Sequence, residues 1–311
     1  MRRAVWLLLG VAVVSVPWLV AALVPRQQRY VLHVLVFTAL FASLALSYDL
    51  VVGHVGSLSL AHPAFFGVGA YTAAILATQA RWSFLTDVLA AGLAAAVVAA
   101  LVGVPLFRLA EHAFAVGTLG LALVASVVAN NWVEVTRGPL CITGIPKPAL
   151  GPLAITTLPA FYWLAVAALG AVVLLYRGLT TFRLGRAFHA VRDNEPLASA
   201  AGIDPLKYRL LAFTIAAGLA GGVGALYVHY LSVMCPEEMT VALTVNLLVI
   251  VFLGGVGTLR GVLVGAVLFT ALPEVLRLAP TWRLVIYGAL LLLVVVRSPG
   301  GIEGLLRGAS R

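Results

Sequence analysis

The chain has 311 residues, of which 62% are hydrophobic and only 10% are charged. A soluble domain is about 45–50% apolar and about 25% charged, so this composition excludes a soluble fold. The net charge of +9 does not indicate nucleic-acid binding, because the cations flank apolar runs and form no basic stripe with aromatic residues. The apolar runs are continuous and about 20 residues long, as in transmembrane helices and unlike β-barrel strands. The predicted fold class is therefore all-α, a polytopic transmembrane helical bundle.

Ten spans are predicted, with eight as the lower bound. They cover residues 4–24, 30–52, 64–80, 88–107, 113–129, 158–176, 210–231, 241–253, 262–272 and 282–296. The first run is too long for the apolar region of a signal peptide and no clear cleavage site follows, so we interpret it as a retained helix. Pro273 is predicted to close the ninth span. A re-entrant arrangement of the short pieces near Gly254 is the alternative that lowers the count.

The distribution of cations predicts that both termini lie inside. In this arrangement the inner segments hold 13 of the 20 lysines and arginines, and the outer segments hold 7. Residues 177–209, the one long charged segment, then lie in the cytoplasm. Residues 130–157 are polar, contain four prolines and form a structured periplasmic loop. Cys141 and Cys235 both lie outside; a disulfide is open to them, but two unpaired thiols are expected.

Two glycine-rich stretches, residues 53–59 and 254–261, interrupt predicted spans. Backbone that is not helical at membrane depth is tolerated only where it is buried in protein or lines a wet cavity. Both stretches follow a span that runs inward, and packing alone is the alternative for any single glycine. Asp49 lies near the inner end of the second span, so we expect its carboxylate to reach water.

No motif in the chain indicates an enzyme. The sequence has no HExxH, GxSxG or Walker A pattern, and no span carries the row of acids or arginines used by proton-driven carriers and voltage sensors. Energy for any transport is therefore expected from a partner. An ATP-independent channel or secondary carrier, and a structural subunit without a pathway, remain the alternatives.

The charged segment, residues 177–209, predicts two helices. From Phe182 to Arg192, the cations and the apolar residues fall on opposite sides of a helix. Asp193 or Asn194 is expected to cap a second, shorter helix that Gly202 ends. The apolar face of this second helix, made by Leu197, Ala200 and Ala201, is suited to a groove on another protein. A solvated connector whose arginines only set topology is the alternative.

Motifs in the same order as in a known family run over roughly residues 30 to 300. They include Gly56-x-Leu58-Ser59-Leu60-x-His62, Asn130-Asn131-Trp132, Thr143-Gly144-Ile145-Pro146, Gly185-Arg186-Ala187, Ala190-Val191-Arg192-Asp193-Asn194-Glu195, Ala200-Ala201-Gly202-Ile203 and Gly254-Gly255-x-Gly257-Thr258-Leu259. In these residues the chain resembles the permease subunits of branched-chain amino acid ABC importers, the LivM type. Pro196-Leu197 stands where the coupling loop of ABC importers usually has two alanines.

The resemblance implies a single permease domain, residues 1–311, that is not an enzyme and sits in the bacterial inner membrane. It implies a second homologous permease subunit, two cytoplasmic ABC ATPase subunits, a periplasmic solute-binding protein and the lipid bilayer as partners, with no nucleic acid. No cofactor is expected in this chain, since ATP and Mg²⁺ would bind the ATPases. The implied substrates are branched-chain, hydrophobic amino acids; urea, short amides or another small solute are the alternative.

The resemblance also carries over two groups of residues. The first is expected to contact the ATPase: Arg186, Arg192, Asp193, Asn194, Glu195, Ala198, Ala200, Gly202 and Ile203. The second is expected to line the translocation pathway: Gly56, Ser57, Ser59, His62, Asn131, Gly254, Gly255, Gly257 and Thr258.

Overall fold

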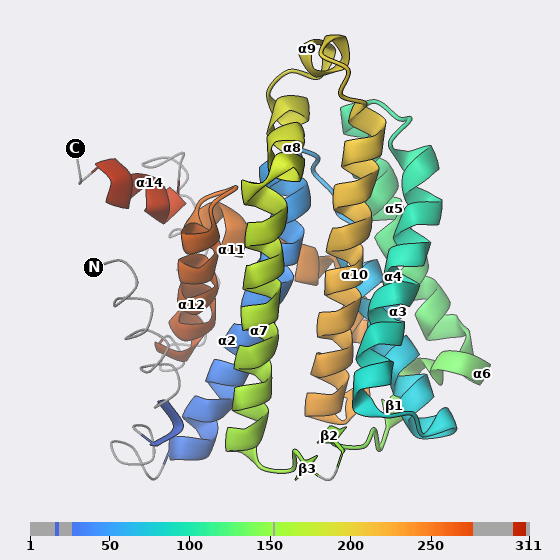
Figure 1. Ribbon diagram of the computed structural model, residues 1–311. Helices are drawn as coiled ribbons and strands as arrows, with labels where there is room; N and C mark the ends of the chain where they lie inside the picture. Colours follow the sequence, from blue (N-terminus) through green and yellow to red (C-terminus); the bar gives the residue numbers. More distant parts are fainter. Residues whose placement is uncertain (1–15, 19–26, 152, 276–300, 309–311) are drawn as a thin grey trace.

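The computed structural model of the protein describes residues 16–18, 27–151, 153–275 and 301–308. Within these residues, five helices are long and apolar enough to cross a membrane. They are α2 (Gln28–Asp49) with its π-helical continuation η2 (Leu50–Val55), α4 (Phe84–Leu106), α5 (Glu111–Asn131), α7 (Leu158–Thr181) and α10 (Pro205–Leu231). The protein is thus an all-α, multi-pass helical bundle, as the composition predicts (Figure 1).

Three shorter apolar helices complete the part of the bundle that the structure describes. They are α3 (His62–Ile75), which η3 (Leu76–Ala80) continues, α11 (Val241–Gly254) and α12 (Leu259–Val275). The predicted second to ninth spans each correspond to one of the eight helices. The predicted tenth span, and the first except for residues 16–18, lie outside the described residues. The prediction that Pro273 closes the ninth span is wrong, because α12 continues through it to Val275.

The connection between α7 and α10 is shorter than the charged segment, residues 177–209, predicts. Helix α7 continues to Thr181, and α10 already begins at Pro205, where Asp204 accepts hydrogen bonds from the backbone N–H groups of Leu206 and Lys207. Between them lie only α8 (Arg183–Asp193), α9 (Glu195–Ala200) and their turns. These two helices stand at one end of the bundle, and strands β1, β2 and β3 lie at the opposite end (Figure 1).

The opposite end is built from segments far apart in the sequence. Strand β1 (Ile142–Thr143) pairs in antiparallel fashion with β4 (Val233–Met234), and β2 (Ala149–Leu150) pairs with β3 (Leu153–Ala154). Residues 130–157 also form α6 (Val133–Thr136) and the 3₁₀ turn η4 (Gly138–Leu140), while η5 (Pro236–Met239) follows β4. The segment is therefore structured, as its prolines and polarity indicate. We call this end of the bundle the β1 end.

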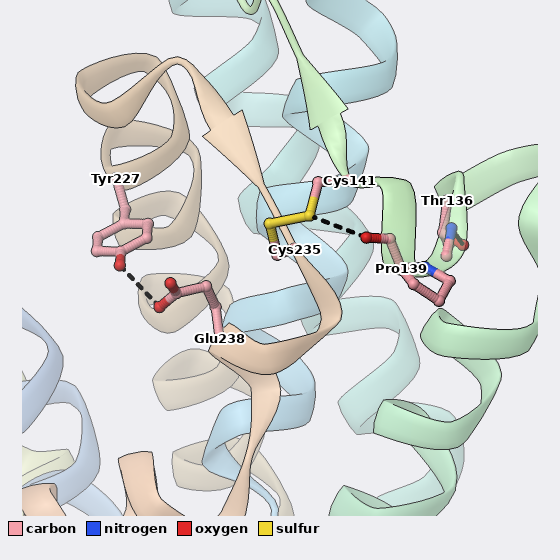
Figure 2. The surroundings of a disulfide bond; sticks show 7 residues. Thr136, Pro139, Cys141, Tyr227, Cys235 and Glu238 are labelled. Atoms are coloured by element: carbon pink, nitrogen blue, oxygen red, sulfur yellow. Dashed lines mark hydrogen bonds between the residues drawn. A yellow bond between two sulfur atoms is a disulfide. The ribbon is translucent and has the colours of Figure 1, made fainter.

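The expectation of two unpaired thiols is wrong. Cys141 and Cys235 form a disulfide with a Cα–Cα distance of 4.5 Å across 94 residues of sequence (Figure 2). The β1–β4 pairing accounts for this bond, because Cys141 immediately precedes β1 and Cys235 immediately follows β4, so antiparallel pairing brings the two residues together. Sequence separation alone gave no sign of that pairing.

Small residues let α10 lie close to α3 and α4 at the centre of the bundle. In the most apolar 18-residue stretch of each helix, 67% of the residues of α10 are buried, whereas only 22% of those of α4 are buried. Ala91, Ala95 and Ala99 of α4 are fully buried and recur every four residues, the spacing of one helix face. Close approach of backbones through such residues is how helices associate where lipid removes the hydrophobic drive.

Replacing Gly221 with alanine is expected to destabilise the bundle by about 1–3 kcal/mol through overpacking. A Cβ atom on Gly221 would lie 2.6 Å from the Cβ of Ala95 and 2.7 Å from the carbonyl oxygen of Ala91, so α4 and α10 would have to separate. Thermal unfolding of the purified protein measures the effect. The matched control is Gly222→Ala in the same helix, whose new Cβ would meet only Val88 at 3.9 Å. Equal unfolding temperatures for the two variants would contradict the packing argument.

Candidate functional site

Helix α8 lies against the end of α2 through an apolar side. Its residues Gly185, Ala187, Phe188 and Val191 are buried, and Phe188 packs with Val55 of η2 and Ala212 of α10. Arg186, predicted to contact an ATPase, is exposed on this helix. The predicted amphipathic helix is confirmed, and its apolar side joins it to α2 and α10.

Helix α9 is the outermost element at this end of the bundle (Figure 1). Of the two predicted caps, Asn194 is the one used: its side-chain oxygen accepts a hydrogen bond from the backbone N–H of Leu197 at 3.0 Å. Leu197 is 67% exposed, whereas Ala198 is only 3% exposed. Gly202 has a φ of +80°, a left-handed conformation that suits glycine at a helix end.

The remaining predicted contact residues of the segment differ in their surroundings. Asp193, Glu195 and Ala200 are exposed, and Ile203 is half-buried with its N–H bonded to the carbonyl of Ala198 at 2.9 Å. The carboxylate of Glu195 pairs with Arg209 at 3.0 Å, which ties α9 to the first turns of α10. The exposed apolar face that the sequence predicts for α9 is therefore present, with Ala198 turned inward.

Arg192 connects α8 to the first glycine-rich stretch. Its guanidinium donates a hydrogen bond to the carbonyl oxygen of Gly53, and its side-chain carbons lie over Gly56. Arg192, Gly56 and Ser57 line one polar cavity of about 410 Å³, together with residues of the α4–α5 turn. A predicted ATPase-contact residue and two predicted pathway residues thus lie side by side.

The expectation that the Asp49 carboxylate reaches water is wrong. Its side chain is fully buried, because α2 does not end near Gly53 but continues as η2 to Val55. The carboxylate accepts hydrogen bonds from the hydroxyl of Tyr176 on α7 and from the backbone N–H of Gly257 at 2.8 Å. A buried carboxylate needs such donors to offset the loss of water.

A chain of hydrogen bonds runs from Asp49 to the surface helix α8. The Tyr176 hydroxyl lies 2.7 Å from Nε2 of His54, and Nδ1 of His54 lies 3.2 Å from Nε2 of His189 on α8. Because Tyr176 gives its one proton to Asp49, His54 donates to Tyr176 through Nε2, and a neutral His54 then accepts from His189 through Nδ1. We call these four residues, Asp49, Tyr176, His54 and His189, the Asp49 chain.

The Asp49 chain also joins the two glycine-rich stretches. Gly257, which donates to Asp49, has a φ of +73°, and a Cβ atom at this position would lie 3.1 Å from the carbonyl oxygen of Gly53. The turn is held by Thr258, whose hydroxyl donates to the carbonyl of Gly255 at 2.7 Å. Gly254 packs tightly against the backbone of Gly261. The two glycine-rich stretches therefore lie in contact.

The non-helical backbone after η2 is satisfied by side chains from other helices. The N–H of Leu60 donates to the hydroxyl of Thr118 on α5 at 2.9 Å, and the carbonyl of Leu60 accepts from Thr244 on α11 at 3.2 Å. Nearby, the carbonyl of Ser59 accepts from Tyr48 at 3.0 Å, and His62 bonds to Ser47 at 2.8 Å. Ser57, Ser59 and Ala61 of this segment are buried in protein, whereas Gly56 is exposed and lines the cavity beside Arg192.

Asn131 lies apart from the other predicted pathway residues. It is the last residue of α5, is exposed, and donates to the carbonyl of Val127 within its own helix at 2.8 Å. Tyr176, His54 and His189 were not among the predicted site residues, although Tyr176 and His54 lie at the edges of apolar runs and His189 lies in the charged segment. Within the described ranges, no three His, Cys, Asp or Glu residues group closely enough to hold a metal ion.

The chain matches a known protein family over most of its length. The sequence model of the family described as "Branched-chain amino acid transport system / permease component" matches residues 30–295. The high-affinity branched-chain amino acid transport system permease protein LivM of Escherichia coli (strain K12) is 31% identical over 303 residues, which cover 90% of this chain and 71% of that protein. No solved structure is significantly similar to the chain.

Two further relatives are more distant. The permease protein LivH of the same kind of system from Salmonella typhimurium is 27% identical over 290 residues, covering 85% of this chain and 91% of LivH. The autoinducer 2 import system permease protein LsrC of Enterobacter sp. (strain 638) is 32% identical over 206 residues, covering 62% of this chain and 55% of LsrC. The family match extends over most of the chain, from α2 to beyond α12, and the chain belongs to the branched-chain amino acid transport system permease family.

Proposed function

We propose that the chain is the membrane-spanning permease subunit of an ATP-binding-cassette importer and that it translocates branched-chain amino acids. The observation that carries the proposal is the Asp49 chain, which links an exposed surface helix pair, α8 and α9, to both glycine-rich breaks in the bundle. A passive helical scaffold has no need for such a buried polar connection, because buried polar groups are costly unless fully bonded.

The α8–α9 end faces the cytoplasm in this proposal, and the β1 end faces the periplasm of the bacterial inner membrane. Two ABC ATPase subunits bind at the α8–α9 end and carry ATP and Mg²⁺, so this chain needs no cofactor. A solute-binding protein docks at the β1 end, and a second homologous permease completes the pathway. The whole chain is one permease domain, with residues 177–209 as its coupling segment.

Coupling follows from the contacts of α8. ATP-driven closure of the ATPases would displace α9, and α8 would move with it through the Asn194 turn. His189 and Arg192 of α8 bond to His54 and to the carbonyl of Gly53, so movement of α8 pulls on η2 and on the Gly257 turn. In this proposal the packed ends of the helices have two arrangements, and a small displacement of α8 switches them from one to the other.

The substrate assignment rests on the relatives. The LivM and LivH proteins are named for branched-chain amino acid transport, and they align with 85% or more of this chain. LsrC, named for autoinducer 2 import, aligns with only 62%. We therefore propose branched-chain amino acids as the solutes, with another small solute of the same importer class as the alternative.

Replacing Leu197 with glutamate is expected to reduce ATP-driven uptake at least about tenfold and to abolish co-purification with the ATPase. The side chain is 67% exposed, so the substitution spares the fold, but a charge in a helix-in-groove contact is strongly unfavourable. Uptake of labelled leucine and pull-down of the ATPase measure both effects. Leu197→Met keeps the apolar contact and should behave as the unaltered protein. Normal uptake by the glutamate variant, or uptake by this chain alone in liposomes without ATP, would refute the proposal.

A further inference from the structure

A buried acid and a buried histidine meet at the β1 end, far from the Asp49 chain. Asp87 lies in the first turn of α4, although the sequence places it in a turn before the span, and His229 lies in the last turn of α10. The exposed fractions of their side chains are only 1% and 2%, and Nε2 of His229 is 3.6 Å from Oδ2 of Asp87. Neither residue takes part in the coupling described above.

The pair lacks hydrogen-bond donors. Nδ1 of His229 lies 2.9 Å from the carbonyl oxygen of Pro146, and since a carbonyl only accepts, Nδ1 must carry the proton. In neutral His229 the other nitrogen, Nε2, is then an acceptor. Neither Nε2 nor either carboxylate oxygen of Asp87 has a hydrogen-bond partner. Three buried acceptors therefore face one another with nothing donating to them, which is unfavourable in a folded protein.

The pair borders a large open cavity. The cavity has a volume of about 670 Å³, and Asp87 and His229 both line it. Its walls come from the end of η3 and the turn before α4, which include Arg81 and Trp82, and from residues 143–151, which include Lys147. The ammonium of Lys147 donates to the carbonyl of Tyr230 at 2.8 Å and makes no hydrogen bond to any of the three acceptors.

We propose that this cavity is the outer solute-binding site and that Asp87 and His229 bind the primary ammonium group of a zwitterionic α-amino acid. A primary ammonium offers three N–H donors, one for each unpartnered acceptor. Arg81, which is exposed on the same cavity, is placed to meet the carboxylate, and Trp82 offers apolar surface to the side chain. The identity of the solute as an amino acid rests on the proposed function; the ammonium site itself rests on the acceptors.

Two other occupants fit the acceptors less well. A single proton shared between Asp87 and His229 would satisfy the nitrogen and one oxygen and leave the second oxygen unbonded. A divalent metal ion needs more protein ligands than this pair supplies, and no third His, Cys, Asp or Glu joins it within the described part of the chain. An ammonium ligand supplies charge and donors together.

The test uses the full-length protein in lipid nanodiscs and saturation-transfer NMR, which registers weak binding. The probes are L-leucine, 3-methylbutylamine, which keeps the ammonium of leucine without its carboxylate, and 4-methylpentanoate, which keeps the carboxylate without the ammonium. Asp87→Asn should weaken binding of the amine and of leucine at least about tenfold, because a hydrogen bond to a charged group is lost, and should leave 4-methylpentanoate unchanged. Glu134→Gln, an exposed acid on α6 outside the cavity, is the matched control and should change nothing.

The outcomes separate the site from the proposed function. An Asp87→Asn protein that unfolds at the normal temperature and binds the amine normally overturns the site, as does a lack of amine binding by the unaltered protein. If Asp87→Asn does not fold, Arg81→Gln, which alters an exposed residue, replaces it. This variant must weaken the binding of 4-methylpentanoate and of leucine and leave the binding of the amine unchanged. Any other pattern overturns the site. Binding of the amine through Asp87 without any binding or uptake of leucine would uphold the ammonium site and refute the proposed substrate. Normal leucine uptake by the complete transporter with Asp87→Asn would uphold the substrate and refute the site.

Discussion

Replacing Asp49 with alanine is expected to abolish ATP-driven uptake and to destabilise the protein by about 2–6 kcal/mol, because two buried donors lose their acceptor at about 1–3 kcal/mol each. The substitution leaves the hydroxyl of Tyr176 and the N–H of Gly257 without their acceptor, at a position with no access to water. It also removes the hydrogen bond by which the Gly257 turn joins the Asp49 chain. Uptake of labelled leucine and thermal unfolding in nanodiscs measure the two effects.

Two milder variants separate stability from coupling. Asp49→Asn keeps an acceptor oxygen for Gly257 and should fold, but its amide cannot hold both bonds in the same way as a carboxylate, so uptake should fall more than stability. Tyr176→Phe removes the link between Asp49 and His54 while Gly257 keeps its bond, and should likewise reduce uptake more than stability. Glu134→Ala, a surface acid at the other end, serves as the control. Normal uptake by the folded Asp49 and Tyr176 variants would mean that the Asp49 chain only supports packing.

Helices α8 and α9 are the part of the candidate site that the sequence predicts best. Residues 182–203 are polar in an apolar chain, so helical periodicity, the Asn194 cap and the Gly202 stop stand out against their surroundings, and the structure has all three. Local signals of this kind depend on neighbours within a few residues. They therefore predict α8 and α9 without knowledge of the rest of the fold.

The sequence does not predict the hydrogen bonds of the Asp49 chain. Asp49 meets a hydroxyl 127 residues away and an N–H 208 residues away, and neither separation follows from any local pattern. Its burial depends on η2, the π-helical extension past Gly53 that a glycine-rich sequence gives no reason to expect. An acid near the end of an apolar run predicts a side chain that reaches water, whereas long-range packing encloses Asp49.

Replacing Cys141 and Cys235 together with serine is expected to destabilise the β1 end by about 2–5 kcal/mol, the usual effect of removing a disulfide that closes a long loop. Strands β1 and β4 have two residues each and cannot hold the two segments together alone. Thermal unfolding of the double variant measures the loss, and added reductant provides the control. Reductant should lower the unfolding temperature of the unaltered protein to that of the double variant. It should not change the unfolding temperature of the double variant. Equal stability of the two proteins without reductant would contradict the expectation.

The same double variant tests whether the two ends of the bundle act separately. Thr143, Pro146 and Lys147 follow Cys141 closely and line the cavity over Asp87 and His229, so freeing this segment should weaken leucine binding there. Helices α8 and α9 lie at the opposite end of the bundle (Figure 1) and make their described contacts with α2, α7 and α10, so binding of the ATPase should be unchanged. Loss of both activities would show that the disulfide supports the whole bundle and not only the β1 end.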